Sequence, residues 1–338
     1  MIDSEFDKIT LNDNNTLHDL DLNKIKVEKP FLKWVGGKTQ ILKEVISKFP
    51  SEMENYHELF LGGGSILLAV LSLQKLNKIK IKNKIYAYDI NIALINVYKN
   101  IQKNKDELFK FIDLYIKEYD NIKGTLINRN PATIVDAKTS KESYYYWIRK
   151  KYNEIDKSTI ECSAIFMFLN KTCFRGIYRE GPNGFNVPFG HYKKTPTIIS
   201  KSEIDKISEL VKDVEFKVDN FSKSIKNVKA GDFVYLDPPY APETSKSFVG
   251  YIADGFTIEM HKQLFTETKN LNQLNEVNEL QEVNKKDESK KIYFVMCNSD
   301  VEIVKDSFSE YKICKVAARR AINSKNPESR TTELIIYN

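Results

Sequence analysis

The sequence predicts an α/β protein, built on a parallel sheet into which a helical domain is inserted. Between residues 56 and 88 a strand, a glycine turn, a helix and a second strand follow one another, and this order describes a βαβ unit with parallel strands. Amphipathic helical patterns replace the strands from about residue 95. After residue 197, short apolar runs resume the strand pattern.

The first half of the expected catalytic domain spans residues 31–94. Within it we expect a helix over 40–49, a strand over 56–60, a helix over 65–76 and a strand over 84–88. Residues 1–30 carry four lysines against seven acidic residues and show no periodicity. This composition is typical of a disordered arm, so we expect these residues to lie outside the fold.

The expected inserted domain spans residues 95–196. It contains predicted helices over 101–119 and 143–153, an apolar stretch over 164–169 and a loop rich in Gly, Asn and Pro. The catalytic domain then resumes over 197–338 with a helix over 203–212 and strands over 214–218, 233–236, 292–296, 311–316 and 333–337. Residues 270–291 are rich in Asn, Glu, Gln and Lys and predict a surface insertion, a frayed helix being one form of it, because they bury too little area to offset their ordering entropy.

The composition excludes several classes of protein. The chain is 41% hydrophobic and 29% charged, as globular proteins are, and its apolar runs are far shorter than the roughly 20 residues that span a bilayer. The N-terminal residues lack the features of a secretion signal, so we expect a cytoplasmic protein. The four cysteines form no CxxC pair, which predicts reduced thiols and no zinc site. The net charge of +6 is compatible with a polyanionic partner.

The sharpest motif is Asp237-Pro238-Pro239-Tyr240. It directly follows the apolar run 233–236, and parallel sheets present ligand-binding groups at the carboxyl ends of their strands. A Pro-Pro turn with a helix-capping aspartate is the alternative interpretation of these four residues alone. Other motifs at strand ends must therefore decide between the two.

A glycine turn, Glu58-Leu59-Phe60-Leu61-Gly62-Gly63-Gly64-Ser65, lies between a predicted strand and a predicted helix. Glycines allow a tight turn and a close approach to a ligand, and the N-terminus of the helix offers free N–H groups. Asp89 ends the next strand, where a carboxylate can accept both hydroxyls of a ribose. A plain strand-to-helix connection is the alternative for the turn alone, but the three motifs together favour nucleoside binding.

Gly36-Gly37-Lys38-Thr39 imitates the end of a phosphate-binding P-loop. That motif requires a glycine where this chain has Leu32, and it follows an apolar strand that the sequence does not predict here. We therefore reject an ATP-hydrolysing function.

From Phe31 to its C-terminus the chain resembles the alpha group of adenine-N6 DNA methyltransferases, the Dam-like family. The resemblance is carried, in the order typical of that group, by FLKWVGGK (Phe31–Lys38), ELFLGGGS (Glu58–Ser65), YDIN around Asp89, FNVPFG (Phe185–Gly190) and DPPY (Asp237–Tyr240). It implies a Rossmann-like sheet that binds S-adenosylmethionine, with no metal, and an inserted domain that recognises DNA. It also implies methyl transfer to N6 of a flipped adenine, within a short palindrome such as GATC.

The resemblance assigns residues to the cofactor site. Asp89 matches the ribose carboxylate, and Phe221 matches the aromatic ring beside the cofactor adenine. The family often has an aspartate directly before that ring, whereas this chain has Asp219-Asn220, so either side chain is a candidate for the adenine amino group. The other cofactor candidates are Trp34, Lys38, Glu58, Phe60, Gly62, Gly64 and Asp237.

Methyl transfer to an exocyclic amine requires acceptors for the two N6 hydrogens. The Asp237 carboxylate and the Pro238 carbonyl suit this role, Pro239 completes the motif, and Tyr240 offers a stacking platform for the flipped base. No cysteine follows a proline, which excludes the nucleophile of cytosine-C5 methylation.

Three rivals are left open. N4-cytosine methylation usually goes with Ser, and protein glutamine methylation with Asn, where this chain has Asp237. A catalytically silent DNA-binding protein is the third, and the intact Asp237 and Tyr240 argue against it.

Residues 165–195 hold five basic residues against one acid, with aromatic residues interleaved. This pattern fits entry into a DNA groove and occupation of the gap that a flipped base leaves. By the resemblance the segment is a recognition hairpin in which Phe174 is the intercalating ring and Ile177, Arg179 and Asn186 lie near bases, with Arg179 suited to a guanine. The remaining candidates are Asn170, Lys171 and Arg175, and a solvated cation or a packing side chain is the alternative for each.

A second basic patch, residues 312–330, holds six cations against Glu328. We expect it to contact DNA phosphates through Arg319 and Arg330, with an ordinary solvated loop as the alternative. The expected partner is double-stranded DNA and the expected state is a monomer. A cognate restriction endonuclease as a second partner and an unaccompanied methyltransferase are both left open.

Overall fold

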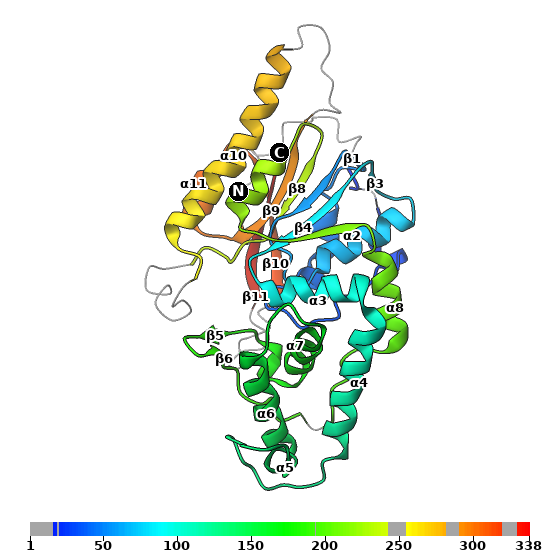
Figure 1. The fold of residues 1–338 in the computed structure, drawn as a ribbon. Coiled ribbons are helices and arrows are strands. Elements are labelled where there is room, and N and C mark those ends of the chain that lie inside the picture. The colour runs from blue at the N-terminus through cyan, green and yellow to red at the C-terminus, as the bar shows by residue number, and fades with distance from the viewer. Residues whose placement is uncertain (1–15, 19, 193, 243–254, 282–290, 320–329) are drawn as a thin grey trace.

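The computed structural model describes residues 16–18, 20–192, 194–242, 255–281, 291–319 and 330–338. Its centre is a seven-stranded sheet in the order β10-β11-β9-β8-β2-β4-β7 (Figure 1). The strands are β2 (Tyr56–Glu58), β4 (Ile85–Asp89), β7 (Val214–Val218), β8 (Phe233–Leu236), β9 (Tyr293–Ser299), β10 (Lys312–Arg319) and β11 (Arg330–Tyr337). The predicted α/β class and a large, mostly parallel sheet are thus confirmed.

Strand β11 runs antiparallel to both of its neighbours, whereas the other pairs of this sheet are parallel. The expectation of a parallel sheet is therefore wrong at this edge. Strands β10 and β11 are consecutive in the chain and pair over eight positions, from Lys312 opposite Tyr337 to Arg319 opposite Arg330. Consecutive strands can pair directly only when they are antiparallel, because a parallel pair needs a longer crossover connection.

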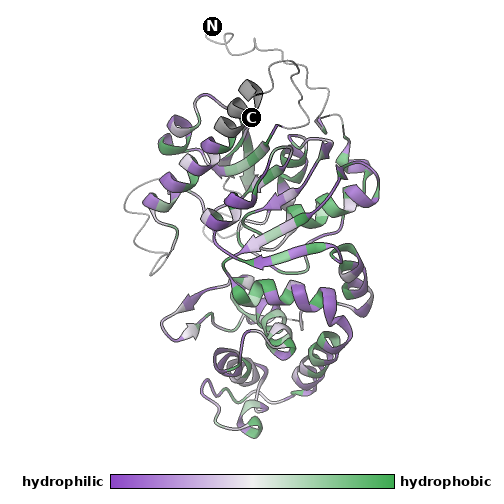
Figure 2. Cartoon of the chain, turned by 45° about the horizontal axis from the view of Figure 1, so that its top comes forward, coloured by the Kyte–Doolittle hydropathy of each residue, from purple (hydrophilic) through white to green (hydrophobic). Residues whose placement is uncertain are grey.

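Alternate residues of the central strands face two helical layers. In β8, Phe233 and Tyr235 belong to one buried cluster, and Val234 and Leu236 belong to the other. The first cluster includes residues of α1 (Leu42–Ile46), α2 (Ser65–Lys75), α3 (Ile92–Lys103) and α8 (Lys201–Leu210), and the second includes residues of α9 (Phe221–Ser224), α10 (Ile258–Gln281) and α11 (Glu302–Ser307). Hydrophobic residues accordingly gather along the strands between the layers (Figure 2).

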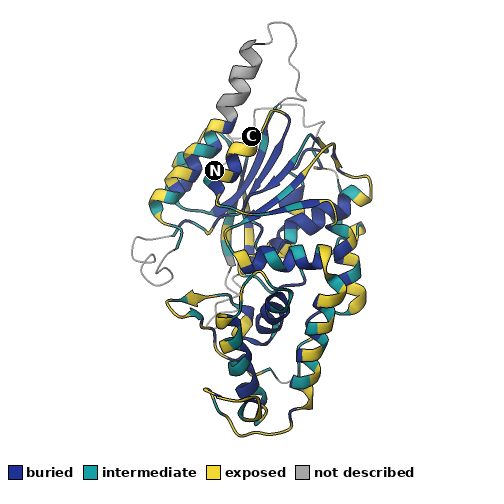
Figure 3. Ribbon diagram, viewed as in Figure 1, coloured by how far each residue is buried: buried dark blue, intermediate teal, exposed yellow. Residues whose placement is uncertain are grey.

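The chain between α3 and α8 is mostly helical and lies below the sheet in Figure 1. Its elements are α4 (Lys105–Asn121), α5 (Ile134–Ala137), α6 (Lys141–Glu154), α7 (Ile160–Thr172), the 3₁₀ turn η3 (Phe174–Gly176) and a small hairpin of β5 (Glu180–Gly181) and β6 (Gly184–Phe185). Helix α7 is almost wholly buried (Figure 3). Because α7 packs on α3 as well as on α4 and α6, the buried cluster continues from one face of the sheet into this segment. The boundary of an inserted domain at residues 95 and 196 stays a prediction.

The helix predicted over 101–119 is two helices, which meet at Asn104. This residue leaves the helical region, with φ −131° and ψ 28°, and its backbone N–H and its side-chain amide both bond to Asn100. Asparagine competes well for backbone hydrogen bonds and so favours helix ends. A similar correction applies near residue 40, where the 3₁₀ turn η2 (Lys38–Gln40) and the short α1 replace the predicted helix over 40–49.

The described residues 16–18 and 20–30 pack against the fold, contrary to the expectation of an arm outside it. Leu17 is buried, its N–H donates to the Phe49 carbonyl at 3.0 Å, and the Glu28 N–H donates to Ser72 Oγ. The short 3₁₀ turn η1 (Leu22–Lys24) lies between these anchors. Apolar side chains spaced along this segment cover the main cluster, which offsets the cost of ordering it; they are Leu17, Leu20, Leu22, Ile25 and Val27. The prediction for residues 1–15 lies outside the described residues.

The described part of the predicted surface insertion is helical, because α10 continues to Gln281. Residues 282–290 lie outside the described residues. The smaller elements are the two-stranded pair β1 (Glu52–Met53) and β3 (Lys80–Ile81), and the 3₁₀ turn η4 (Ile225–Asn227).

Candidate active site

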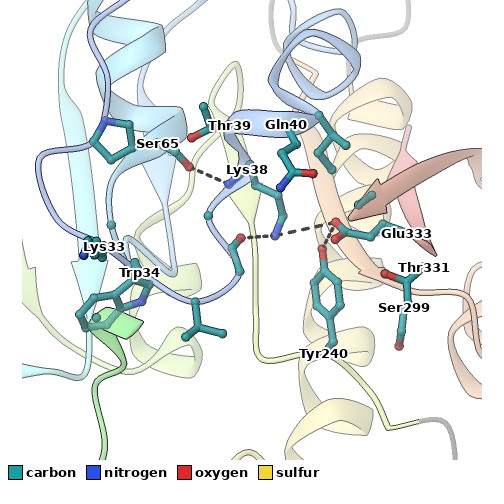
Figure 4. A pocket seen from close by; sticks show the side chains of 18 of the residues that line it. Lys33, Trp34, Lys38, Thr39, Gln40, Ser65, Tyr240, Ser299, Thr331 and Glu333 are labelled. Atoms are coloured by element: carbon teal, nitrogen blue, oxygen red, sulfur yellow. Dashed lines mark hydrogen bonds and ion pairs between the residues drawn. The ribbon is translucent and has the colours of Figure 1, made fainter. Parts of the chain in front are cut away.

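A cavity of about 1460 Å³ opens at the edge of the sheet where β2, β8 and β9 end and β11 begins. Its walls come from Ala318 and from six separate stretches of the chain, which lie within residues 29–41, 63–65, 175–177, 240–242, 299–301 and 331–333. Figure 4 shows Lys38, Tyr240 and Glu333 pointing toward one another inside it. Segments that the sequence separates by up to 300 residues therefore share one site.

Lys38 is the central cation of the cavity and is only 3% exposed. Its Nζ lies 2.8 Å from Asp237 Oδ1 and 4.0 Å from Glu333 Oε2, and it donates to the Gly36 carbonyl at 2.7 Å. Burial by itself lowers the pKa of Lys38, but Asp237, with smaller contributions from Cys297 and Glu333, raises it more. The charged partners of Lys38, in the segment that imitates a P-loop, are thus carboxylates.

Asp237 directly follows β8, as the sequence predicts. Burial raises the pKa of its carboxyl to about 6; Lys38 opposes this shift and Glu333 adds to it. Two carboxylates and one ammonium in contact leave a local charge of about −1 once Asp237 ionises. The site is therefore suited to a positively charged group.

Tyr240 is held by two contacts from different elements. Its hydroxyl donates to Glu333 Oε2 at 2.5 Å, and Lys38 Nζ lies 4.8 Å from the centroid of its ring. The end of β9 fixes the next residue, since the Ala241 N–H donates to Asn298 Oδ1 at 3.0 Å and Ser299 Oγ donates to the Ala241 carbonyl at 2.5 Å. The proline motif is thus held rigidly at both ends.

The glycine turn is shaped by Trp34. A Cβ on Gly62 would lie 2.9 Å from the Trp34 ring, and a Cβ on Gly63 would lie 2.7 Å from the Trp34 side chain. Gly64 has φ 68°, and a Cβ there would lie 2.2 Å from the Tyr98 hydroxyl. Trp34 and Tyr98 therefore fill the space that side chains would take at these positions, so the turn requires glycine for packing within the protein.

Asp89 is joined to the same turn. Its Oδ2 accepts the Gly62 N–H at 3.0 Å and its Oδ1 accepts the Asn91 N–H at 2.9 Å, while burial raises the pKa of the carboxyl against these bonds. The next residue, Ile90, is 72% exposed. An apolar surface therefore lies beside a carboxylate that has free lone pairs. Ile90 was not among the residues predicted from the sequence.

Phe221 lies in a cluster of aromatic rings. It is buried, with its ring 6.0 Å from that of Phe60 and 5.5 Å from that of Phe256. Asn220 caps α9, since its Oδ1 accepts the Lys223 N–H at 3.0 Å, whereas the Asp219 side chain is 26% exposed. Phe60 therefore connects the glycine turn with the predicted adenine ring partner.

Glu58 is the last residue of β2. It is 1% exposed and accepts a 2.6 Å hydrogen bond from the Tyr56 hydroxyl. Burial raises the pKa of Glu58 to about 8, with Tyr56 opposing and Asp237 adding to the shift. At neutral pH this carboxyl is therefore mainly protonated, and its direct contact with a cofactor stays a prediction.

The predicted DNA-binding segment reaches the same cavity. Arg175, Gly176 and Ile177 line it together with Tyr240. Phe174 is 44% exposed, and the Arg175 guanidinium lies 5.2 Å from the centroid of its ring. The structure thus brings the basic hairpin segment and the proline motif together.

Asn170 is a correction to the predicted DNA contacts. It is 5% exposed, and its amide bonds to the Lys33 N–H at 2.9 Å, the Lys33 carbonyl at 2.7 Å and the Gly176 carbonyl at 3.4 Å. A buried amide with these partners joins α7 to the N-terminal wall of the cavity and is not available to DNA. The sequence could not separate this role from a surface role, because both use a polar residue near a basic loop.

The other predicted DNA contacts are distributed unevenly. Arg179 and Asn186 are exposed on the hairpin, and Lys171 is half-buried, with its pKa lowered by burial and by Lys33. The side chains of Arg319 and Arg330 lie outside the described residues. These DNA contacts stay predictions.

Two residues that were not predicted from the sequence hold the loop after β8, and of these Glu333 lines the cavity. Glu333 stands on β11 opposite Ser299, and Asn298 is fully buried at the end of β9. A signal for Glu333 was available, because an acidic residue directly before the apolar run 334–336 is unusual in a strand. No signal marked Asn298.

In the parts of the chain that the structure describes, no helix combines the length and the apolar character needed to cross a membrane. Across the same residue ranges, no cluster of three or more His, Cys, Asp or Glu side chains is placed to hold a metal ion.

Comparisons with known proteins identify similar chains. The family model of the D12 class N6 adenine-specific DNA methyltransferases matches residues 34–322. The Type II methyltransferase M1.LlaDCHI of Lactococcus lactis subsp. cremoris is 30% identical over 328 residues, 94% of this chain and 98% of that protein. The Type II methyltransferase M.MjaIII of Methanocaldococcus jannaschii is 31% identical over 322 residues, 92% and 99% of the two chains. The DNA adenine methylase of Haemophilus influenzae is 27% identical over 304 residues, 89% and 90% of the two chains.

Proposed function

Because this chain belongs to the D12 class of N6 adenine-specific DNA methyltransferases, we propose that its cavity receives a flipped adenine and that Asp237 presents the N6 amine for methylation. The observation that carries the assignment is the buried contact between Lys38 and Asp237 at the end of β8. Lys38 and Tyr240 line the cavity, and the contact with Lys38 joins the Asp237 carboxylate to them. The enzyme transfers a methyl group to adenine N6 in DNA.

The family implies S-adenosylmethionine as the methyl donor, and the residues present fit it. Asp89 retains lone pairs for ribose hydroxyls, and the exposed Ile90 offers apolar contact for a nucleobase. The buried Phe221 stays a candidate on the resemblance to the family. For the adenine amino group we favour Asp219, because the Asn220 side chain already caps α9. Among the described residues these are the ones that would hold the cofactor.

When bound, S-adenosylmethionine supplies an electrophilic methyl group on a positively charged sulfur. The Asp237 and Glu333 carboxylates outnumber Lys38 and so favour a cation beside them. Lys38 occupies Asp237 Oδ1, which leaves Oδ2 to accept an N6 hydrogen, and the Pro238 carbonyl is proposed to accept the other. These bonds localise the nitrogen lone pair and aim it at the methyl carbon.

Transfer would join the methyl carbon to N6 as its bond to sulfur breaks, which would leave a neutral thioether, and N6 would release one proton. The pKa of about 6 allows Asp237 to be ionised at neutral pH and still to accept this proton transiently. The Tyr240 ring, fixed by Glu333 and Lys38, serves as the stacking platform for the base.

For DNA recognition we propose the helical segment, residues 95–196, with the η3 turn and the β5–β6 hairpin as its contact surface. The exposed Phe174 would fill the gap left by the flipped base, and the exposed Arg179 would contact a guanine. A palindrome such as GATC is the site we propose from the resemblance to the Dam-like family. The two Type II names among the relatives are consistent with a restriction-modification role.

The test is nucleoside mass spectrometry of unmethylated DNA after incubation with the purified protein and S-adenosylmethionine. We expect N6-methyladenine from the wild type and none from Asp237→Ala, which should still bind duplex DNA. N4-methylcytosine as the product would overturn the assignment of the base. An active Asp237→Ala variant would overturn the role of that carboxylate.

A further inference from the structure

A side-chain pair on the hairpin joins two residues across its strands. The Asn186 N–H donates to the Arg179 carbonyl at 3.2 Å, which continues the pairing of Glu180 with Phe185 by one step. The two side chains therefore stand on the same face, and Arg179 Nε donates to Asn186 Oδ1 at 2.6 Å. This bond is short and lies on the exposed side of the hairpin.

Helix α6 fixes the strand that carries Asn186. Asn153 bonds to both backbone groups of the preceding residue, with 2.8 Å to the Phe185 N–H and 3.1 Å to its carbonyl. The next residue is fixed as well, since the Tyr145 hydroxyl and Arg149 Nη1 donate to the Val187 carbonyl at 2.7 and 3.1 Å. Asn186 is thus held in place through its backbone on both sides.

The hairpin also makes room for the Asn186 amide. A Cβ on Gly181 would lie 2.6 Å from Asn186 Nδ2, closer than side chains tolerate, so the absence of a side chain at this position is what admits the amide. The neighbouring acid does not compete for Arg179, because Glu180 Oε1 accepts the Tyr178 hydroxyl at 2.5 Å. Consecutive residues of a strand face opposite sides, which separates Glu180 from Arg179.

We propose that Asn186 is a positioning residue that sets the base specificity of Arg179. A guanidinium can bind a guanine edge either through Nε and one Nη or through both Nη atoms. Because Asn186 occupies Nε, only the two terminal nitrogens are presented to DNA, and they match the O6 and N7 acceptors of guanine end-on. The neutral amide orients the guanidinium without cancelling its charge. This inference rests on the proposed function, in which the hairpin contacts DNA bases.

The experiment uses a pool of duplexes with a randomised window around one adenine, incubated with S-adenosylmethionine and then sequenced for methylated adenines. Asn186→Ala should lower the preference at one base pair by about tenfold, and Arg179→Ala should lower it at the same base pair. Asn186→Asp keeps the acceptor, so it should keep the preference but methylate more slowly, because the added charge weakens attraction to phosphates. Asn130→Ala, at an exposed position outside the hairpin, is the matched control and should leave the preference unchanged.

Two further variants test the coupling itself. Gly181→Ala keeps the Asn186 side chain but should push its amide away from Arg179. It should therefore reproduce the loss of preference seen with Asn186→Ala. The double variant Arg179→Ala with Asn186→Ala should lose no more preference than Arg179→Ala alone, since the second residue acts through the first. Additive losses, or a loss at a different base pair for Asn186→Ala, would overturn the inference.

The outcomes also separate this inference from the proposed function. If the wild-type protein methylates no adenine, the proposed function itself is wrong. If the wild type is selective and Arg179→Ala keeps the same preference, Arg179 does not contact the base. The positioning role of Asn186 is then wrong as well. A preference that falls with Arg179→Ala but not with Asn186→Ala would remove only the positioning role.

Discussion

The Tyr240 hydroxyl donates a 2.5 Å hydrogen bond to Glu333 Oε2, which ties the loop after β8 to the antiparallel strand β11. The reversed strand thus contributes to the proposed base site. It brings an acidic side chain to the edge of the sheet where the parallel strands end, and that side chain fixes the plane of the ring proposed to support the target base.

Replacing Tyr240 by Phe keeps the ring and removes this bond. We expect the single-turnover rate to fall about fivefold to tenfold, the size of one lost hydrogen bond, while the Kd for duplex DNA changes little. Rapid-quench methylation with saturating DNA measures the rate. Glu333→Gln retains an acceptor and should lose less than Glu333→Ala, and an unchanged rate in Tyr240→Phe would show that the bond does not position the ring.

The pKa of Asp237 predicts an acid limb in the rate of methylation. Burial raises this pKa to about 6, and the carboxylate form is the one that accepts an N6 hydrogen. The single-turnover rate should therefore rise with pH through about 6 and level off above 7, with the slope expected of one proton. Rates measured between pH 5 and 8 at fixed ionic strength test this.

Two variants should move that limb in opposite directions. Glu333→Gln removes a charge that raises the Asp237 pKa, so the limb should shift to lower pH. Lys38→Met removes the cation that lowers this pKa, so the limb should shift to higher pH. Shifts of the same sign in both variants would contradict the electrostatic account of the site.

Most of the fold could be predicted from the sequence because its elements carry strong local signals. Strand β8 is a run of apolar residues that ends at a turn, and α2 begins directly after a glycine turn. The direction of β11 could not be predicted, because an apolar run has the same pattern in either direction. The burial of Leu17 depends on a distant partner, Phe49, and no local pattern reports such a contact.

The candidate site was predictable where its residues belong to motifs, as Asp237 and Asp89 do. Glu333 and Asn298 were missed because each acts across the sheet on the loop after β8, and pairing between strands is not visible in one sequence. Asn170 was misassigned for the same reason, since its partner Lys33 lies 137 residues away.

The contact of Trp34 with the glycine turn predicts a spectroscopic signal. The chain has two tryptophans, so Trp147→Phe leaves Trp34 as the single reporter. Adding S-adenosylmethionine should change its fluorescence, because Trp34 lines the cavity and packs on the turn proposed to hold the cofactor. In this background Gly63→Ala should weaken binding by tenfold or more, since a Cβ there would displace Trp34. No fluorescence change at saturating cofactor would place the cofactor elsewhere.

Asp89 should contribute to cofactor binding in two ways that variants can separate. Asp89→Ala removes both the ribose acceptor and the bond to the Gly62 N–H, and should raise the Kd for S-adenosylmethionine by about tenfold or more. Asp89→Asn keeps one oxygen for the turn and should cost less. Isothermal titration gives both values, and equal losses would mean that the bond to the Gly62 N–H contributes nothing and that Asp89 acts only through its charged carboxylate.

Buried Glu58 predicts how stability depends on pH. Its pKa is about 8 in the folded protein and near 4.5 in the unfolded chain, because burial disfavours the charged form. Below about pH 4.5 the group is protonated in both states and costs nothing. Between these values the unfolded chain has released a proton that the folded protein still holds, so the free energy of unfolding falls as pH rises, by a few kcal/mol in all.

Glu58→Gln resembles the protonated form and can still accept the Tyr56 hydroxyl, so it should lose less stability between pH 5 and 8. Urea unfolding at both pH values gives the comparison, and the exposed Glu310→Gln should behave like the wild type. If the free energy of unfolding falls more steeply with pH in Glu58→Gln than in the wild type, the predicted effect has the opposite sign. Glu58 would then be ionised in the folded protein.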